Sequence, residues 1–173
     1  MHSNPRSILA VNPGTRYLGL AVFYGNQLKD WRIKILKGRW SRAKQQKALG
    51  IIGDFIERYR PDVLAIKRLH PSRTSRGLEA FTLQLRRTCL KKGLTLTQYS
   101  IKQLEEYFCR DNQKNKRNLA GAVAANYPEL YTEFNSEYGE MMPDGKKQKN
   151  PYHIKMFEAV ALGAMCANEL DNH

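Results

Sequence analysis

Alternating apolar and β-branched residues in the first third of the chain predict three antiparallel strands. A short apolar run at residues 8–11 ends at the turn sequence Asn-Pro-Gly. Strand-forming residues continue over Tyr17–Tyr24, and a third alternating stretch, Gln27–Ile35, follows a Gly-Asn pair. Gly and Asn between two such stretches are typical of a hairpin turn. The pattern therefore predicts an antiparallel meander.

Helical spacing of apolar residues begins after residue 41. Apolar side chains recur from Ala48 to Tyr59 behind Ser41, a suitable N-terminal cap, and Pro61 ends this segment just before the apolar run at 63–66. The same order repeats, with helical spacing over 78–89, a helix-ending glycine at position 93 and a strand-like run at 94–99. Strand, helix and strand in this order predict parallel crossovers, so we expect two further strands that are parallel.

The last third of the chain predicts helices and one long loop. Ser100 and Gln103 form a capping box for a short helix, and residues 118–125 indicate another that ends before Pro128. Residues 129–150 lose periodicity and predict an exposed loop within a single domain spanning 1–173. Asn150 and Pro151 are a suitable cap and first residue for a final helix, whose segment 156–167 is apolar on nearly every face and is expected to be buried.

The composition is that of an ordinary globular protein. Hydrophobic residues make up 42% of the 173 residues, and no apolar run approaches the roughly 20 residues that a membrane span needs. No secretion signal is evident at the N-terminus, so we expect a cytoplasmic protein with no membrane partner, with nucleoid association as an alternative. The three cysteines lie far apart with no metal-ligand spacing, and we expect them to be reduced core residues.

The charge balance favours a polyanionic partner. The chain has 29 Lys and Arg against 16 Asp and Glu, a formal net charge of +13. Nucleic acid is the commonest such partner, because each phosphate that is neutralised releases condensed counterions. Membrane-surface binding would require a basic amphipathic helix, which the pattern lacks. The alternative is that the charge only keeps the surface solvated.

Three motifs, in order along the chain, resemble those of RuvC-type Holliday-junction resolvases. ILAVNPGTRYLGLAV (residues 8–22) resembles the first-strand motif, with Asn12 where the family has Asp. RPDVLAIKRLH (60–70) resembles the later core strand, with Lys67 in place of Glu, and KMFEAVALGAM (155–165) resembles the terminal helix, with Lys155 and Glu158 at the acidic positions. Weaker matches, SRGLEAF, QYSIKQL and NKRNLAGAVAANYP, lie between them, so the resemblance spans nearly the full chain.

This resemblance implies a ribonuclease H-like α/β fold, a mixed five-stranded sheet with three antiparallel and two parallel strands flanked by helices. The order of strands and helices along the chain is by itself a weak indication of this fold, since many α/β domains share that order. The resemblance also implies that Asn12, Lys67 and Glu158 converge within about 8 Å. We expect a Lys67–Glu158 pair across the position of the family's metal centre.

The family's chemistry implies two Mg²⁺ ions held by about four acidic groups. Here those positions hold Asn12, Lys67, Lys155 and Glu158. An ammonium within about 4 Å of a metal position opposes the cation by roughly 4 kcal/mol at an effective dielectric near 20. We therefore expect no metal, no cofactor and no catalytic residue, and a pseudo-nuclease that binds branched or structured nucleic acid, DNA in preference to RNA. Mg²⁺ is expected only if the protein is an active enzyme.

Basic residues beside this site are the candidates for phosphate contacts, in loops and at helix N-termini where backbone phosphates are commonly bound. They are Lys67, Arg68, Arg73, Arg76, Lys114, Lys116, Arg117 and Lys155. Trp31, Trp40 and Tyr99 are candidates for stacking on exposed bases, with packing in the core as the alternative.

Other interpretations of the same residues stay open. Asn12 suits a turn before Pro13 whatever its ancestry, and Lys155 and Glu158 could form a plain ion pair on one helix face. His70 could be a general base or only a polar surface residue. An active endonuclease with a rearranged metal site would need His153, Glu158 and Asp62 together, although Asp62 precedes its strand. A dimerisation or interaction subunit, as a possible homodimer, is the third possibility.

Overall fold

The structure, a computed structural model, describes residues 4–111, 113–138 and 153–173. Five strands form one mixed sheet in the order β3-β2-β1-β4-β5. The strands are β1 (Ser7–Asn12), β2 (Tyr17–Tyr24), β3 (Gln27–Ile35), β4 (Val63–Lys67) and β5 (Thr95–Tyr99). β1, β2 and β3 pair antiparallel, whereas β4 and β5 join in parallel on the other side of β1. This confirms the expected sheet.

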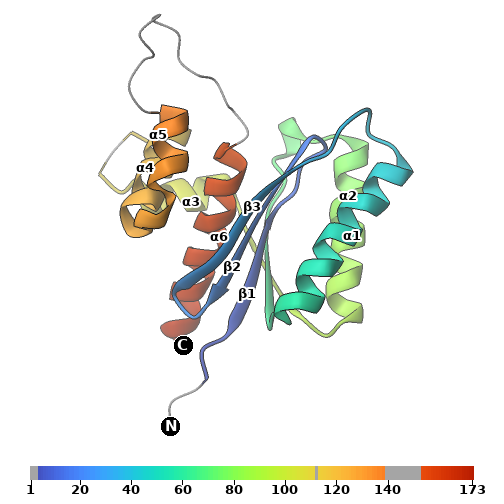
Figure 1. The fold of residues 1–173 in the computed structure, drawn as a ribbon, viewed down its shortest axis with the longest axis horizontal. Coiled ribbons are helices and arrows are strands. Elements are labelled where there is room, and N and C mark those ends of the chain that lie inside the picture. Colours follow the sequence, from blue (N-terminus) through green and yellow to red (C-terminus); the bar gives the residue numbers. More distant parts are fainter. Residues whose placement is uncertain (1–3, 112, 139–152) are drawn as a thin grey trace, which may run out of the picture.

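Helices cover both faces of the sheet, giving three layers (Figure 1). One face carries α1 (Arg42–Tyr59) and α2 (Arg76–Lys91). The other carries the helices that follow β5, with α6 packed directly on the sheet. They are α3 (Ile101–Phe108), α4 (Lys116–Asn126), α5 (Tyr131–Tyr138) and α6 (His153–Asp171). Short 3₁₀ turns, η1 (Pro71–Arg73) and η2 (Pro128–Leu130), precede α2 and α5.

The central strand β1 divides the core into two parts. Ile8 and Ala10 pack on the α6 side, whereas Leu9 and Val11 pack on the side of α1 and α2. Successive strand residues point to opposite faces, so a strand buried on both faces has no polar alternation. This is why residues 8–11 form an uninterrupted apolar run.

Helix α6 approaches the sheet closely because β2 offers a glycine at the crossing. A Cβ atom on Gly19 would lie 2.1 Å from the main-chain oxygen of Lys155 in the first turn of α6. Gly19 is also the register partner of Asn12, the last residue of β1. The small residue therefore brings the start of α6 against the end of β1. The middle of α6 is buried, as its apolar composition predicts.

The predicted loop at 129–150 is wrong for residues 131–138, which form α5. Phe134 packs edge-on against Phe157 of α6, and Tyr138 stacks beside Phe134. Glu133 and Glu137 of α5 instead contact polar partners on β3 and α6. Polar residues on an inward-facing surface conceal the helical period. Residues 139–150, with the proposed cap at Asn150 and Pro151, lie outside the described residues.

Several local predictions are confirmed. Ser41 caps α1, and the capping box of Ser100 and Gln103 opens α3. All three cysteines are free and buried. Across the part of the chain that the structure describes, no helix is both long and apolar enough to cross a membrane.

The close approach at Gly19 can be tested by adding a single methyl group. Gly19→Ala should lower the free energy of unfolding by about 3 kcal/mol, because the new Cβ would overlap main-chain atoms of Lys155, which cannot move away as a flexible side chain can. Gly50→Ala is the matched control, since a Cβ there meets nothing within 4 Å on exposed α1, and it should stabilise by about 0.5–1 kcal/mol. Urea unfolding of both variants measures the difference. Wild-type stability of Gly19→Ala would contradict the packing of α6 described above.

Candidate functional site

Two neighbouring parallel strands end side by side at one edge of the sheet. Asn12 is the last residue of β1 and Lys67 the last of β4, and Val11 and Ile66 before them are register partners. The first two turns of α6 lie over this edge and supply Lys155 and Glu158. Carboxyl ends of neighbouring parallel strands are a common location for ligand sites in α/β folds.

A buried carboxylate is the centre of the site. Glu158 is only 2% exposed, and its Oε2 accepts hydrogen bonds from Lys67 Nζ at 2.6 Å and from Asn12 Nδ2 at 2.8 Å. Asn12 Nδ2 also donates to the main-chain oxygen of Lys155 at 3.2 Å. The expected convergence and the expected Lys67–Glu158 pair are both confirmed. The ion pair of Glu158 is thus with Lys67 on another element, in place of one with Lys155 on its own helix.

These residues do not fit a Mg²⁺ ion of the family type. Mg²⁺ takes oxygen ligands, but Asn12 directs its amide N–H groups at Glu158 Oε2 and the main-chain oxygen of Lys155, and Lys67 places an ammonium on the same carboxylate. Within the described residues, no group of three or more His, Cys, Asp or Glu side chains could hold a metal ion. The positive charge beside Glu158 in the structure is the Lys67 ammonium.

A pocket of about 230 Å³ opens beside this carboxylate and brings together most of the predicted phosphate-binding residues. Five basic side chains line it: Lys67, Arg68, Arg73, Lys116 and Lys155. Two carboxylates, Glu105 and Glu158, line it as well. Positive charge is therefore in excess.

The other three predicted residues, Arg76, Lys114 and Arg117, are exposed and do not line the pocket. Arg76 and Arg117 lie at the beginnings of α2 and α4, and Lys114 just precedes α4. These three side chains can contact only phosphates that lie outside the pocket. Glu105 on α3 is a lining residue that the sequence did not indicate, because it lies beyond both the capping box and the QYSIKQL match.

Lys155 is held in an unfavourable electrostatic position. Burial lowers the pKa of its ammonium group below the ordinary 10.5, and the positive charges of Lys67 and Lys116 lower it further, while Glu158 opposes the shift. Each of these causes except Glu158 disfavours the charged form. An anion bound in the pocket would favour the charged form of Lys155.

His70 lies at the mouth of the pocket and has a local structural role. Its Nδ1 accepts from the backbone N–H of Ser72 at 3.2 Å and lies 2.7 Å from the Ser72 hydroxyl. The imidazole thereby caps η1, the turn that carries Arg73. A role as a general base stays a prediction.

The alternative prediction of a metal site formed by His153, Glu158 and Asp62 together is wrong. Asp62 Oδ2 accepts from the backbone N–H of Ser7 at 2.9 Å, and Ser7 begins β1 whereas Asn12 ends it. Asp62 is therefore at the opposite end of the strand from Glu158. This agrees with its position before β4 in the sequence.

The aromatic candidates pack in the protein. Tyr99 is only 3% exposed, and Trp40 packs edge-on against Phe81 with a centroid distance of 5.6 Å. Trp31 is partly buried, and its Nε1 donates to Glu133 Oε1 at 3.0 Å. Core packing, the alternative to base stacking, is confirmed for Tyr99 and Trp40.

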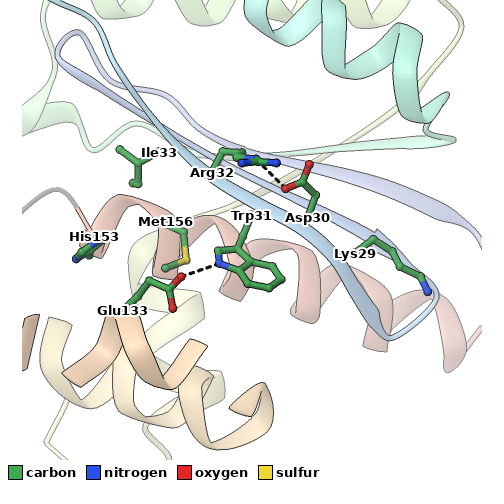
Figure 2. A pocket seen from close by; sticks show the side chains of 8 residues that line it. All are labelled: Lys29, Asp30, Trp31, Arg32, Ile33, Glu133, His153 and Met156. Atoms are coloured by element: carbon green, nitrogen blue, oxygen red, sulfur yellow. Dashed lines mark hydrogen bonds and ion pairs between the residues drawn. The ribbon is translucent and has the colours of Figure 1, made fainter. Parts of the chain in front are cut away.

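A second pocket, of about 430 Å³, lies between β3, α5 and α6 (Figure 2). Trp31 and Met156 point into it beside Glu133, and Asp30 pairs with Arg32 at its rim at 2.9 Å. His153 also lines it and pairs with Glu137 across 3.4 Å. This pocket contains none of the predicted phosphate-binding residues and is distinct from the one beside Glu158.

The fold is similar to solved structures of Holliday-junction resolvases. Thermus thermophilus RuvC aligns with a TM-score of 0.69 at 12% identity, over 96% of each chain. The same protein in complex with a Holliday-junction substrate aligns at 0.64 with 13% identity, over 92% of this chain and 90% of that one. Fowlpox virus resolvase with junction DNA aligns at 0.55 with 12% identity, over 94% and 99%.

At such identities the likeness shows the fold. The expected ribonuclease H-like architecture of RuvC is therefore confirmed. The chain matches no protein-family model and no curated protein.

Removing Lys67 should destabilise the protein, because Glu158 would stay buried with its charge uncompensated. Lys67→Met should lower the free energy of unfolding by about 2–3 kcal/mol at pH 7, somewhat less than a fully buried pair because Lys67 is 20% exposed and Asn12 still donates. Lys92→Met removes an exposed pair with Glu57 and should change stability by less than about 0.5 kcal/mol. Equal effects of the two changes in urea unfolding would contradict the importance of the buried carboxylate.

Removing Lys155 should have the opposite effect. Its pKa is lowered on folding, so the charged amine opposes folding at neutral pH, and this cost disappears as pH rises towards 10.5. Lys155→Met should therefore raise the melting temperature at pH 7 and lose this advantage at alkaline pH. Lys47→Met, on the exposed side of α1, is the control and should change little. A lower melting temperature for Lys155→Met than for the control would refute this electrostatic description.

Proposed function

We propose that the protein binds branched or structured nucleic acid, DNA in preference to RNA, through phosphates at the pocket beside Glu158, and does not hydrolyse it. The observation that carries this proposal is the Lys67 ammonium 2.6 Å from Glu158. It supplies positive charge at the position where the resolvase resemblance implies a metal ion. No cofactor is needed for binding of this kind.

Charge and fold support the binding half of the proposal. Five basic side chains against two carboxylates give the pocket a net formal charge of +3. Ammonium and guanidinium groups form short, charge-assisted hydrogen bonds to phosphate oxygens. The solved structures with a similar fold include two resolvases in complex with junction DNA, which favours DNA and branched substrates for this chain.

The absence of hydrolysis follows from what the site can and cannot supply. In-line hydrolysis of a phosphodiester by two metal ions requires cations that coordinate both the attacking and the leaving oxygen. A lysine can neutralise a phosphate oxygen, but it cannot activate a water molecule as a metal ion does. One carboxylate oxygen of Glu158, Oε2, is already engaged by Lys67 and Asn12.

Salt dependence measures the binding directly. If about five phosphates are neutralised, the logarithm of the affinity should fall against the logarithm of the salt concentration with a slope near −4 to −5 on duplex DNA. Lys116→Gln should reduce the magnitude of this slope by about one, whereas Lys47→Gln on α1 should leave it unchanged. Fluorescence anisotropy with four-way-junction, duplex and single-stranded probes gives the slopes. No binding to any probe at low salt would favour an interaction subunit instead.

Cleavage assays decide between binding and catalysis. Junction DNA incubated with the wild-type protein and Mg²⁺ or Mn²⁺ should remain intact on a denaturing gel. Specific, metal-dependent scission that Glu158→Ala abolishes would show that the protein is an active endonuclease. Cleavage that persists in Glu158→Ala would indicate a contaminating nuclease, because it would not depend on the site around Glu158.

A further inference from the structure

The lining of the pocket beside Glu158 is only partly suited to a phosphate. In addition to its basic residues, it contains five apolar ones: Pro13, Leu69, Leu78, Ile101 and Ile154. Aliphatic carbon offers nothing to a phosphate, whose affinity comes from charge and N–H donors. Apolar surface gains free energy when another apolar surface covers it. The mixed lining therefore fits an anion that carries an apolar part.

The size of the pocket limits that ligand to a small one. Its volume of about 230 Å³ is below the roughly 300 Å³ at which typical small-molecule pockets begin. A double helix cannot enter such a space. A single nucleotide, with one phosphate and one base, has the required combination of charge and apolar surface.

The side-chain oxygen of Asn12 adds a buried acceptor to the site. Its side-chain amide is oriented by the two acceptors that its Nδ2 contacts, and its Oδ1 is buried with no hydrogen-bond partner among the described residues. A buried acceptor without a donor is costly. Asn12 lines the pocket, so a nucleobase with an N–H group that approached this oxygen would relieve that cost.

We propose that this pocket receives one unpaired nucleotide of a bound DNA strand, with its phosphate on the basic side chains and its base against the apolar ones. The inference rests on the proposed function and specifies its substrate further. A base that is already unpaired leaves the stack at the lowest cost, so the protein should prefer DNA with an unpaired nucleotide over fully paired DNA. The preference should come from the base as well as from the phosphate.

Three duplexes of the same sequence test this preference. One is fully paired, the second carries a single bulged nucleotide, and the third carries the same bulge without its base. The wild-type protein should bind the bulged duplex about tenfold more tightly than the paired one, equivalent to about 1.4 kcal/mol. The abasic bulge carries the same phosphates but no base, so it should lose most of this preference. Equal affinities for the bulged and abasic duplexes would overturn the inference.

Leu69 provides the matching protein variant. It is partly buried in the loop after β4 and lines the pocket, so Leu69→Ala should lower the ratio of the affinity for bulged DNA to the affinity for paired DNA. Leu83→Ala, at a 47% exposed position on α2 outside the pocket, should keep the preference. A full preference in Leu69→Ala would also overturn the inference. Failure to bind any of the three duplexes would contradict the proposed function itself, so the two failures are distinguishable.

Discussion

The buried carboxylate of Glu158 is the constraint on which the site depends. A charge that is 2% exposed must be paired, and here the partners are the ammonium of Lys67 and the amide of Asn12. The two partners end neighbouring strands, and Glu158 lies on the helix that crosses them. One interaction thus joins β1, β4 and α6, and it occupies the position where the resolvase resemblance implies a cation. Gly19 makes it possible by admitting the first turn of α6.

The sequence predicted the elements whose burial has a simple period, and the resemblance to the resolvase motifs implied the convergence of Asn12, Lys67 and Glu158. It missed α5, because Glu133 and Glu137 face inward there and satisfy Trp31 and His153 through polar contacts. It left the partner of Glu158 open, since Lys155 is nearer along the chain but Lys67 is nearer in space. Lining residues such as Leu69 and Glu105 depend on packing that no local pattern records.

Of the two lysines beside Glu158, one stabilises the folded protein and the charged form of the other destabilises it. Lys67 neutralises Glu158, whereas Lys155 is desolvated and repelled by Lys67 and Lys116. A group that opposes folding is expected where function requires it, because selection can keep a costly residue that binds a ligand. A phosphate would relieve the repulsion among the lysines without displacing the Lys67–Glu158 pair. The excess of basic side chains in the pocket therefore favours an anion.

We infer that the Lys67 ammonium stands in place of a metal ion, and Mn²⁺ binding followed by electron paramagnetic resonance distinguishes the two. The wild-type protein should leave Mn²⁺ free in solution at millimolar concentration. The double variant Asn12→Asp/Lys67→Glu, which adds two carboxylates beside Glu158, should bind it, provided that circular dichroism shows the variant to be folded. Stoichiometric Mn²⁺ binding by the wild-type protein that is lost in Glu158→Gln would contradict the claim.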